Sequence, residues 1–516
     1  MYDFIVVGAG TAGAVIAARL AEGGERVLLL EAGARAGSPV ADLPGTAHLA
    51  RARPELSLAF ESEPDPSCDG RRHTLRAGCM LGGSSAINAL AYMRGAEADF
   101  DHWRELGNTG WGASDVRPYF ARAEGMDGAR TRSLALEEAP PGEAMASAFL
   151  AAAQAEGLPP TEARHAAGRE GAGKFLATVR RGRRVSAAAA YLGRRLPPGV
   201  HLVLGAAARH VLFEGARAVG IAYARGGETL EARAAGGVVL AAGAIGSPLL
   251  LERSGVGAPG RIKAAGIAPR VELPGVGEGL QDHFAVLLEY AARPIASAPR
   301  TPAGGGLLRA GLAWLARREG PLARLPSPAY AFLRTRIDVA APDIAVHCVP
   351  GGFREERPDL ALTLAVSATR PEARGSVHLS APEAAAKPRL SLAFLSESGD
   401  RETLAAGLER ARGLAAASPL AGLLGPEVSP GQGAREAEAL LAHARATGLP
   451  LNHLSGTCKM GVTPMAVVGP DLKVRGASHL AVADASIMPR LVSANPLATV
   501  VMIAEKAADL LLAARR

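Results

Sequence analysis

A glycine-rich turn lies between two apolar segments at the start of the chain. Residues 8–13 read GAGTAG, which fits the pattern G-x-G-x-x-G. The β-branched and aromatic run at residues 4–7 precedes the turn, and residues 14–20 follow it with helical spacing. A second apolar run, residues 26–30, ends at Glu31. This order predicts a strand, a tight turn, a helix and a parallel strand within about 30 residues, the βαβ unit that binds dinucleotides.

The turn is expected to hold the diphosphate of a dinucleotide, either FAD or NAD. Its glycines permit a sharp turn and a close approach of the backbone, and the helix start adds free N–H groups and a partial positive charge. Glu31 is placed to accept hydrogen bonds from the ribose. The expected contacts of this unit are Gly8, Gly10, Thr11, Ala12, Gly13, Glu31 and Ala32.

The composition is that of a globular protein. Of 516 residues, 48% are apolar and 21% are charged, and at about 150 residues per domain the length predicts two to four domains. The net charge of +7 is small for this length, and the densest basic run, residues 180–184, contains no aromatic residue. We therefore expect no nucleic-acid partner.

Cysteine spacing and the N-terminus indicate the compartment. The four cysteines form no C-x-x-C pair, so we expect neither a disulfide framework nor a metal site. The chain shows no signal-peptide pattern and no run of about 20 apolar residues that would span a membrane. We expect a cytoplasmic protein without an integral membrane segment, and leave open a peripheral contact with the inner membrane through an electron acceptor.

Three further motifs resemble those of one enzyme family. They are GCMLGGSSAIN at residues 78–88, GAIGSPLLLERSGVG at residues 243–257, and NHLSGTCKMG at residues 452–461, followed by VADAS at residues 482–486 and by Asn495-Pro496. Together these motifs resemble the glucose-methanol-choline (GMC) oxidoreductases, which are FAD enzymes that oxidise alcohols. The resemblance runs from residue 3 to about residue 511.

The resemblance implies an α/β fold. It consists of a Rossmann-like FAD-binding domain into which an antiparallel-sheet substrate domain is inserted, as in p-hydroxybenzoate hydroxylase. The expected FAD-binding domain is discontinuous, with residues 1–150, 195–290 and 450–516, and the substrate domain takes residues 151–194 and 291–449. The spacing of apolar residues adds four local predictions. They are strands at 360–366 and 375–380, and helices at 404–416 and 436–446.

The resemblance also implies further FAD contacts. The Gly82-Gly83-Ser84 stretch is by itself typical of a loop whose backbone approaches an anion or a flat ring closely. The remaining FAD contacts implied by the family are Met80, Asn88, Ala208, Asp484, Ala485 and Pro496. Ile87 occupies the position that carries a flavin-linking histidine in some members, so the FAD is expected to be non-covalent.

Oxidation of an alcohol requires loss of the hydroxyl proton and transfer of a hydride, for which the flavin N5 is the acceptor. A base that works near neutral pH is usually histidine. The family places His453 above the flavin and Asn495 beside it, where its amide can bond the substrate oxygen. His283 follows Asp282, but adjacent residues of a strand face opposite ways, so we expect a structural histidine there.

The resulting expectation is an FAD-dependent dehydrogenase or oxidase that acts on CH–OH donors. The substrate is a primary, aryl or choline-like alcohol, and the acceptor is oxygen, a quinone or a redox protein. Two alternatives remain: a flavin-dependent fatty-acid photodecarboxylase, which is a lyase, and a non-catalytic flavoprotein. His453 argues against the first, and the intact His453/Asn495 pair argues against the second. The oligomeric state stays open.

Overall fold

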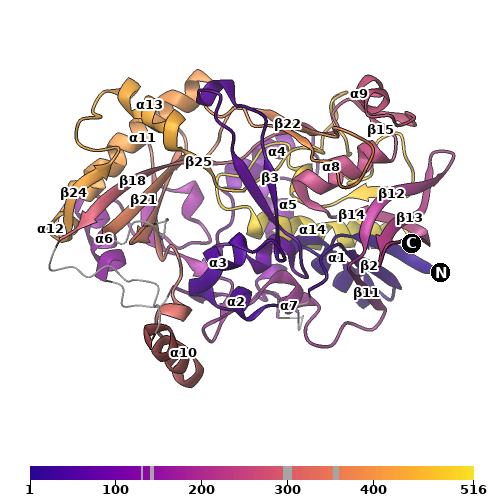
Figure 1. Cartoon of the computed structure of the whole chain (residues 1–516), viewed down its shortest axis with the longest axis horizontal. Helices are drawn as coiled ribbons and strands as arrows, with labels where there is room; N and C mark the ends of the chain where they lie inside the picture. Colours follow the sequence, from indigo (N-terminus) through magenta and orange to yellow (C-terminus); the bar gives the residue numbers. More distant parts are fainter. Residues whose placement is uncertain (36, 129–131, 140–143, 294–304, 353–358, 516) are drawn as a thin grey trace.

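The computed structural model describes residues 1–35, 37–128, 132–139, 144–293, 305–352 and 359–515. Two large sheets lie at opposite ends of the molecule, and helices pack against both (Figure 1). Within the part described, no helix is long and apolar enough to cross a bilayer.

The first sheet is built around parallel strands. β1 (Tyr2–Val7) lies between β2 (Val27–Glu31) and β14 (Glu228–Leu240), and β11 (Val200–Leu204) and β26 (Leu480–Val482) extend the two sides, all in parallel. The strand order is β11-β2-β1-β14-β26. Crossover helices bury both faces of such a sheet, which explains the continuous apolar runs of β1 and β2. The expected α/β fold is confirmed.

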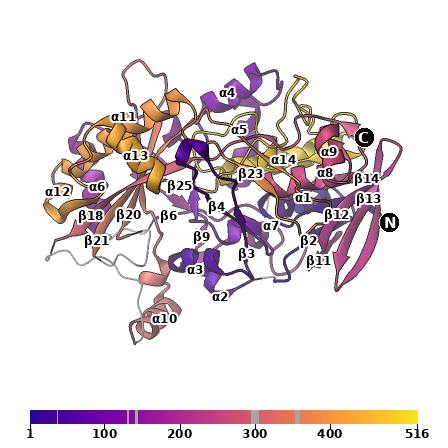
Figure 2. The ribbon, with the colours of Figure 1, turned by 45° about the horizontal axis from the view of Figure 1, so that its top comes forward.

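Strand β14 belongs to two arrangements. Its second half pairs with β1 in parallel, whereas its first half pairs antiparallel with β13 (Arg217–Arg225). β13 in turn pairs with β12 (Ala207–Glu214), and the resulting meander projects beyond the parallel strands (Figure 2). The 13-residue length of β14 makes this double role possible.

Two helices from opposite ends of the chain pack together on the parallel sheet. α1 (Thr11–Glu22) is buried from Ala12 to Leu20, and α14 (Leu497–Ala513) is buried from Leu497 to Ala508. Both helices belong to the large apolar core that also holds β1. The small side chains of α1 allow α14 to approach closely.

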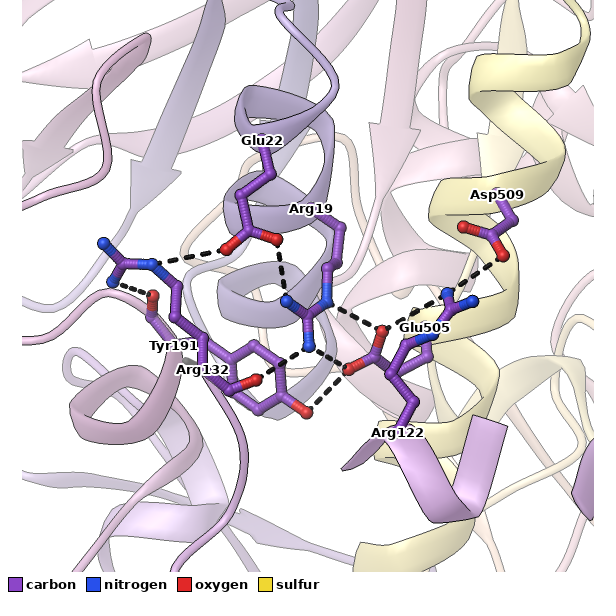
Figure 3. A network of polar contacts seen from close by, with 7 residues as sticks. All are labelled: Arg19, Glu22, Arg122, Arg132, Tyr191, Glu505 and Asp509. Atoms are coloured by element: carbon purple, nitrogen blue, oxygen red, sulfur yellow. Dashed lines mark hydrogen bonds and ion pairs between the residues drawn. The ribbon is translucent and has the colours of Figure 1, made fainter. Parts of the chain in front are cut away.

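A buried ion pair lies between these helices (Figure 3). The Arg19 guanidinium donates to both carboxylate oxygens of Glu505 at 2.8 Å, and the Tyr191 hydroxyl donates to Glu505 at 2.7 Å. The side chains of Arg19 and Glu505 are 2% and 0% exposed. Glu22 accepts another hydrogen bond from Arg19 at 2.7 Å, so the charges are well compensated.

The second sheet is antiparallel, with strand order β24-β18-β21-β20-β19-β7, and β25 pairs with β18. Its strands are β7 (Gly171–Lys174), β18 (Phe284–Ala292), β19 (Ala329–Leu333), β20 (Ile344–Pro350), β21 (Leu360–Ala368), β24 (Leu424–Ser429) and β25 (Leu449–Pro450). Alternate side chains of β18, β20 and β21 enter a core shared with α6 (Ala144–Ala155), α11 (Ser398–Ala416) and α13 (Ala437–Thr447). The other face carries Ala345, His347, Ala365 and Ser367.

The four local predictions are confirmed. The strands correspond to β21 and to β22 (Gly375–His378), and the helices correspond to α11 and α13. The domain boundaries stay a prediction. Residues 294–304 and 353–358 of the expected substrate domain lie outside the described residues.

Candidate active site

The glycine turn is as tight as its sequence predicts. Gly8 follows β1 with a φ of +100°, and a Cβ there would lie 2.6 Å from the Ala241 carbonyl oxygen. A Cβ on Gly13 would lie 1.8 Å from the Gly8 carbonyl oxygen. These positions exclude side chains, and α1 already begins at Thr11, within the motif. The expected contacts Gly8, Gly10 and Thr11 are half-buried, whereas Ala12 and Gly13 are buried.

The Glu31 carboxylate lies at the end of β2 and is held from two sides. One oxygen accepts the Ala9 N–H at 2.9 Å and the other accepts the Gly33 N–H at 2.8 Å. Burial raises the pKa of Glu31 to about 7. Each oxygen keeps a further lone pair for a ribose hydroxyl. Ala32 is exposed beside it, and the turn before Ala208 meets the same strand end, since Ala206 N–H donates to the Glu31 carbonyl at 2.8 Å.

The second glycine loop packs directly against the first. The Gly82 N–H donates to the Ala9 carbonyl at 2.8 Å, and a Cβ on Gly83 would lie 2.7 Å from the Gly10 Cα. Gly82 and Gly83 have φ values of +96° and +51°, in the left-handed region that favours glycine. The next residue, Ser84, is exposed. The two loops therefore form one surface.

Met80 and Asn88 flank this loop. Met80 is 2% exposed, in a small apolar cluster with Ile87. The Asn88 side-chain oxygen accepts hydrogen bonds from the Leu90 N–H at 3.0 Å and from Arg184 at 2.7 Å. These contacts hold the C-terminal end of the loop in place.

Asp484 fixes a third segment at the same edge. One carboxylate oxygen accepts the Gly243 N–H at 2.8 Å and the Ser247 hydroxyl at 2.6 Å, and the other accepts the Ser486 N–H at 2.8 Å. The side chain thus ties the turn after β26 to the start of α8 (Gly243–Arg253). Ala485 and Pro496, expected to contact the cofactor, are half-buried nearby in the chain.

The expected cofactor contacts gather at the carboxyl ends of the parallel strands. Gly8 follows β1, Glu31 ends β2, Gly243 follows β14 and Asp484 follows β26. Ligands of open α/β sheets bind at this edge, and the adjoining glycines admit the backbone approach that a dinucleotide needs. The residues present therefore fit an FAD: Glu31 for its ribose and the two glycine loops with the start of α1 for its diphosphate.

Asp282 holds the turn that carries His453. Its carboxylate accepts the Asn452 N–H at 3.0 Å and the His453 N–H at 2.6 Å. Asn452 has a φ of +61°, and its side-chain oxygen accepts the Arg76 N–H at 2.6 Å. Burial raises the pKa of Asp282 to about 8.

The His453 ring lies between an imidazole and an amide. Its Nδ1 is 2.8 Å from the Nδ1 of His283, and its Nε2 is 3.2 Å from the Nδ2 of Asn495. The Nε2 of His283 is 3.0 Å from the Thr369 carbonyl oxygen. The structure thus brings together His453 and Asn495, as expected from the sequence.

These contacts determine which nitrogens carry protons. A carbonyl only accepts, so His283 carries its proton on Nε2 and, when neutral, accepts at Nδ1. His453 then carries its proton on Nδ1, which leaves a lone pair on Nε2. Desolvation, with smaller Coulomb contributions from His283, His347 and Arg51, holds the pKa of His453 well below its usual value. Desolvation also lowers the pKa of His283 to about 4, so both rings are neutral near pH 7.

His283 contacts His453 directly, whereas the sequence predicted a structural histidine at this position. The alternation rule applies within a strand, but Asp282 and His283 precede β18, and both contact the turn at residues 452–453. Arg51, in the last turn of α3 (Ala47–Ala52), was also missed. The one sequence signal that could have indicated His283 was the adjacent Asp282-His283 pair.

Comparisons with known proteins identify the family of this chain. The GMC oxidoreductase models for the N-terminal and C-terminal regions match residues 2–285 and 371–504. An oxygen-dependent choline dehydrogenase of Photobacterium profundum is 34% identical over 99% of this chain and 93% of that protein. Another, from Xanthomonas euvesicatoria pv. vesicatoria, is 36% identical over 98% of this chain and 95% of that protein.

Solved structures give the same result. Pyridoxine 4-oxidase from Mesorbium loti superposes with a TM-score of 0.87 and 31% identity over 99% of both chains. A formate oxidase of Aspergillus oryzae has a TM-score of 0.90 over 99% of this chain and 98% of that chain, but at 22% identity it shows the fold alone. The expected family and the expected FAD cofactor are confirmed. The chain belongs to the GMC oxidoreductase family and is an FAD-dependent alcohol oxidoreductase.

Proposed function

We propose that this protein oxidises a primary or aryl alcohol to the carbonyl compound, with His453 as the base. One observation carries the proposal: the Nε2 lone pair of a neutral His453 lies beside the Asn495 amide. Bound FAD supplies the acceptor for the substrate hydride. The substrate hydroxyl donates its proton to His453 Nε2, while Asn495 bonds the same oxygen and orients it.

The paired imidazoles give the proton a route away from the substrate. His453 takes the hydroxyl proton on Nε2 and passes its Nδ1 proton to the Nδ1 of His283. His283 then becomes the imidazolium, which keeps its hydrogen bond to the Thr369 carbonyl. Positive charge moves one ring away from the reacting carbon, where it no longer opposes the loss of hydride.

The charge around His453 favours some of the candidate alcohol substrates over others. The groups that lower the pKa of His453 after desolvation are His283, His347 and Arg51, which are positive when ionised. Asp282 lies behind the turn, and its pKa of about 8 leaves it mostly neutral near pH 7. A quaternary ammonium alcohol would meet repulsion from Arg51. The similarity to pyridoxine 4-oxidase, whose named substrate carries its hydroxymethyl groups on an aromatic ring, supports an aryl alcohol instead.

The choline-like alternative, expected from the sequence motifs and supported by the names of the relatives, is tested directly. We would mix the purified protein, without oxygen and in the dark, with benzyl alcohol, pyridoxine, ethanol or choline, and follow the flavin absorbance. Bleaching fastest with an aryl alcohol is expected, and bleaching fastest with choline would contradict the substrate assignment. Readmitting air then distinguishes an oxidase from a dehydrogenase by the rate of reoxidation. Light-dependent release of carbon dioxide from a fatty acid would instead identify a photodecarboxylase.

An Arg51→Gln variant tests the charge argument. Removing the cation should raise the rate with choline relative to benzyl alcohol by about 10-fold, the effect of about 1.4 kcal/mol of repulsion. Arg53→Gln, in the exposed residue that caps α3, serves as the matched control and should leave the ratio unchanged. An unchanged ratio in Arg51→Gln would show that Arg51 does not select the substrate.

A further inference from the structure

A second cluster of titratable side chains lies between β3 (Ser57–Glu61) and β4 (Thr74–Gly78), outside the catalytic site. Asp65, Cys68 and His73 are 2%, 0% and 4% exposed. A carboxylate oxygen, the thiol sulfur and a ring nitrogen of these residues all lie within 4.8 Å of one another. Three different ligand types are therefore buried at one point.

The imidazole of His73 has one buried nitrogen that is not hydrogen-bonded among the described residues. His73 Nε2 is buried without a hydrogen-bond partner among the described residues, and the Asp65 Oδ2 atom lies 3.7 Å away, beyond hydrogen-bond distance. The ring meets Phe284 and Phe394 edge to face, both at 90°. These aromatic contacts hold the ring with its free nitrogen directed at the cluster, and a buried polar atom of this kind indicates a missing partner.

The other two groups are already oriented by backbone contacts. Asp65 accepts the Ser67 N–H at 3.0 Å with one oxygen and the Phe394 N–H at 2.9 Å with the other. The Cys68 thiol donates to the Phe394 carbonyl at 3.7 Å. Metal ligands are positioned by such outer contacts, and the carbonyl oxygen of Phe394 is available as a fourth ligand.

The cluster has the charge pattern that suits a divalent ion. One carboxylate and one thiolate would balance its two positive charges, and the neutral imidazole would complete the set.

We propose that Asp65, Cys68 and His73 bind a zinc ion. Zn²⁺ accepts nitrogen, oxygen and sulfur ligands in a tetrahedral arrangement, in which neighbouring nitrogen and oxygen ligands are about 3.3 Å apart. The 3.7 Å between Asp65 and His73 requires a shift of only a few tenths of an ångström. Binding deprotonates the Cys68 thiol and releases that proton to solvent. The D-x₂-C-x₄-H spacing mixes ligand types, which is why the absence of C-x-x-C pairs did not reveal it.

The site has a structural role. Its three ligands lie in the connection between β3 and β4, whereas Phe394 comes from a distant segment. The metal therefore holds the hairpin and that segment together. Further along β4, the Arg76 N–H donates to Asn452, next to His453. The zinc ion therefore stabilises the hairpin that supports the turn of the candidate base.

Metal content of the full-length flavoprotein tests the proposal. The protein is treated with a chelator, dialysed and equilibrated with Zn²⁺ alone, and bound zinc is measured by plasma mass spectrometry together with the unfolding temperature. We expect one zinc per chain and a rise in unfolding temperature with Zn²⁺. Cys68→Ala should weaken zinc binding by at least about 100-fold, since losing an outer contact alone costs 10 to 100-fold.

Two variants make the result specific. Cys348→Ala also truncates a buried cysteine in the same apolar core and should bind zinc normally. His73→Phe keeps the aromatic packing with Phe284 and Phe394 and removes the ligand, so it should stay folded and lose the zinc. Cobalt should give the visible bands of a tetrahedral thiolate site, beyond the flavin absorption, in the wild type and not in His73→Phe. Folded wild-type protein without zinc, or equal zinc in His73→Phe, would overturn the proposal.

Discussion

The side chain of His453 is constrained at both ring nitrogens. His283 accepts from one and Asn495 approaches the other, and the tautomer follows from the carbonyl of Thr369, which fixes the proton of His283. A base fixed in this way needs no rotation before it accepts a proton.

Replacing His453 by alanine should separate binding from chemistry. We expect the variant to keep its fold and its FAD while the rate of flavin reduction by the alcohol falls by at least about 10²-fold, the usual contribution of a general base. Anaerobic stopped-flow measurement checks this. His479→Ala, in an exposed histidine at the amino end of β26, should react normally. A near-normal rate in His453→Ala would remove the residue from its proposed role.

The pH dependence of flavin reduction follows from the same environment. A base works in its unprotonated form, so a pKa held below the usual value moves the loss of activity to lower pH. The limiting rate should therefore stay constant as the pH falls from about 8 through about 6.5, the ordinary pKa of histidine, and decline only below it. A decline centred at or above that ordinary value would contradict the neutral, desolvated His453.

Glu31 is expected to act on cofactor retention rather than on chemistry. Glu31→Ala removes the acceptor for the ribose and for the N–H groups of Ala9 and Gly33. FAD affinity should fall by about 10-fold or more, because each hydrogen bond to a charged group contributes about 1.5–3 kcal/mol. The amount of flavin per chain after gel filtration reports this affinity. Glu228→Ala, at an exposed position, is the control. Unchanged flavin content would rule out the ribose assignment.

Among the elements, α1 and α14 depend on each other through one ion pair. Arg19 and Glu505 are both buried, and each would be a costly isolated charge. The pair therefore fixes how the C-terminal helix docks on the nucleotide-binding unit. Because Asn495 and Pro496 precede α14, this docking also positions Asn495, which we propose to bond the substrate oxygen.

Breaking this pair should destabilise the protein strongly. Glu505→Gln leaves Arg19 with Glu22 as its remaining charged partner, and we expect a loss of about 3 kcal/mol in the free energy of unfolding. Asp509→Asn breaks the more exposed ion pair with Arg122 and should cost less than about 1 kcal/mol. Urea midpoints of the FAD-loaded proteins compare the two. Equal urea midpoints for the two variants would mean that burial of the Arg19–Glu505 pair contributes nothing to the stability of the protein.

At the scale of the whole molecule, the expected cofactor contacts come from widely separated parts of the chain. The turn after β1, the end of β2, the loop at residues 78–88 and the turn after β26 all meet at one edge. A bound FAD therefore links the two ends of the sequence, and its binding free energy adds to that of folding.

Removal of FAD should consequently lower the unfolding temperature of the entire chain. Ile87 is buried and offers no nucleophile for a covalent link, so acid precipitation should release the flavin into the supernatant. At a free FAD concentration about 100 times its dissociation constant, the loss corresponds to about 2.7 kcal/mol. Calorimetry of holoprotein and apoprotein measures it. Yellow colour retained in the acid pellet would show a covalent flavin.

Local sequence was sufficient wherever a signal lay within one short segment. The glycines of residues 8–13, the periodicity of β21 and the spacing of α11 could be interpreted alone, because turn geometry and the periods of strand and helix are local properties. His453 and Asn495 could be named through the family resemblance. His283 could not, because its role depends on a neighbour 170 residues away.

The order of residues by itself determined the βαβ unit, its glycine turn and the acid at the end of β2, since these follow from backbone sterics and apolar periodicity. Only the tertiary structure decided which nitrogen of His453 carries the proton, that Arg51 contributes to its lowered pKa, and which groups surround His73. Each of these depends on distances between side chains from separate elements. Desolvation and Coulomb interactions act through space, and their strength is set by the folded arrangement alone.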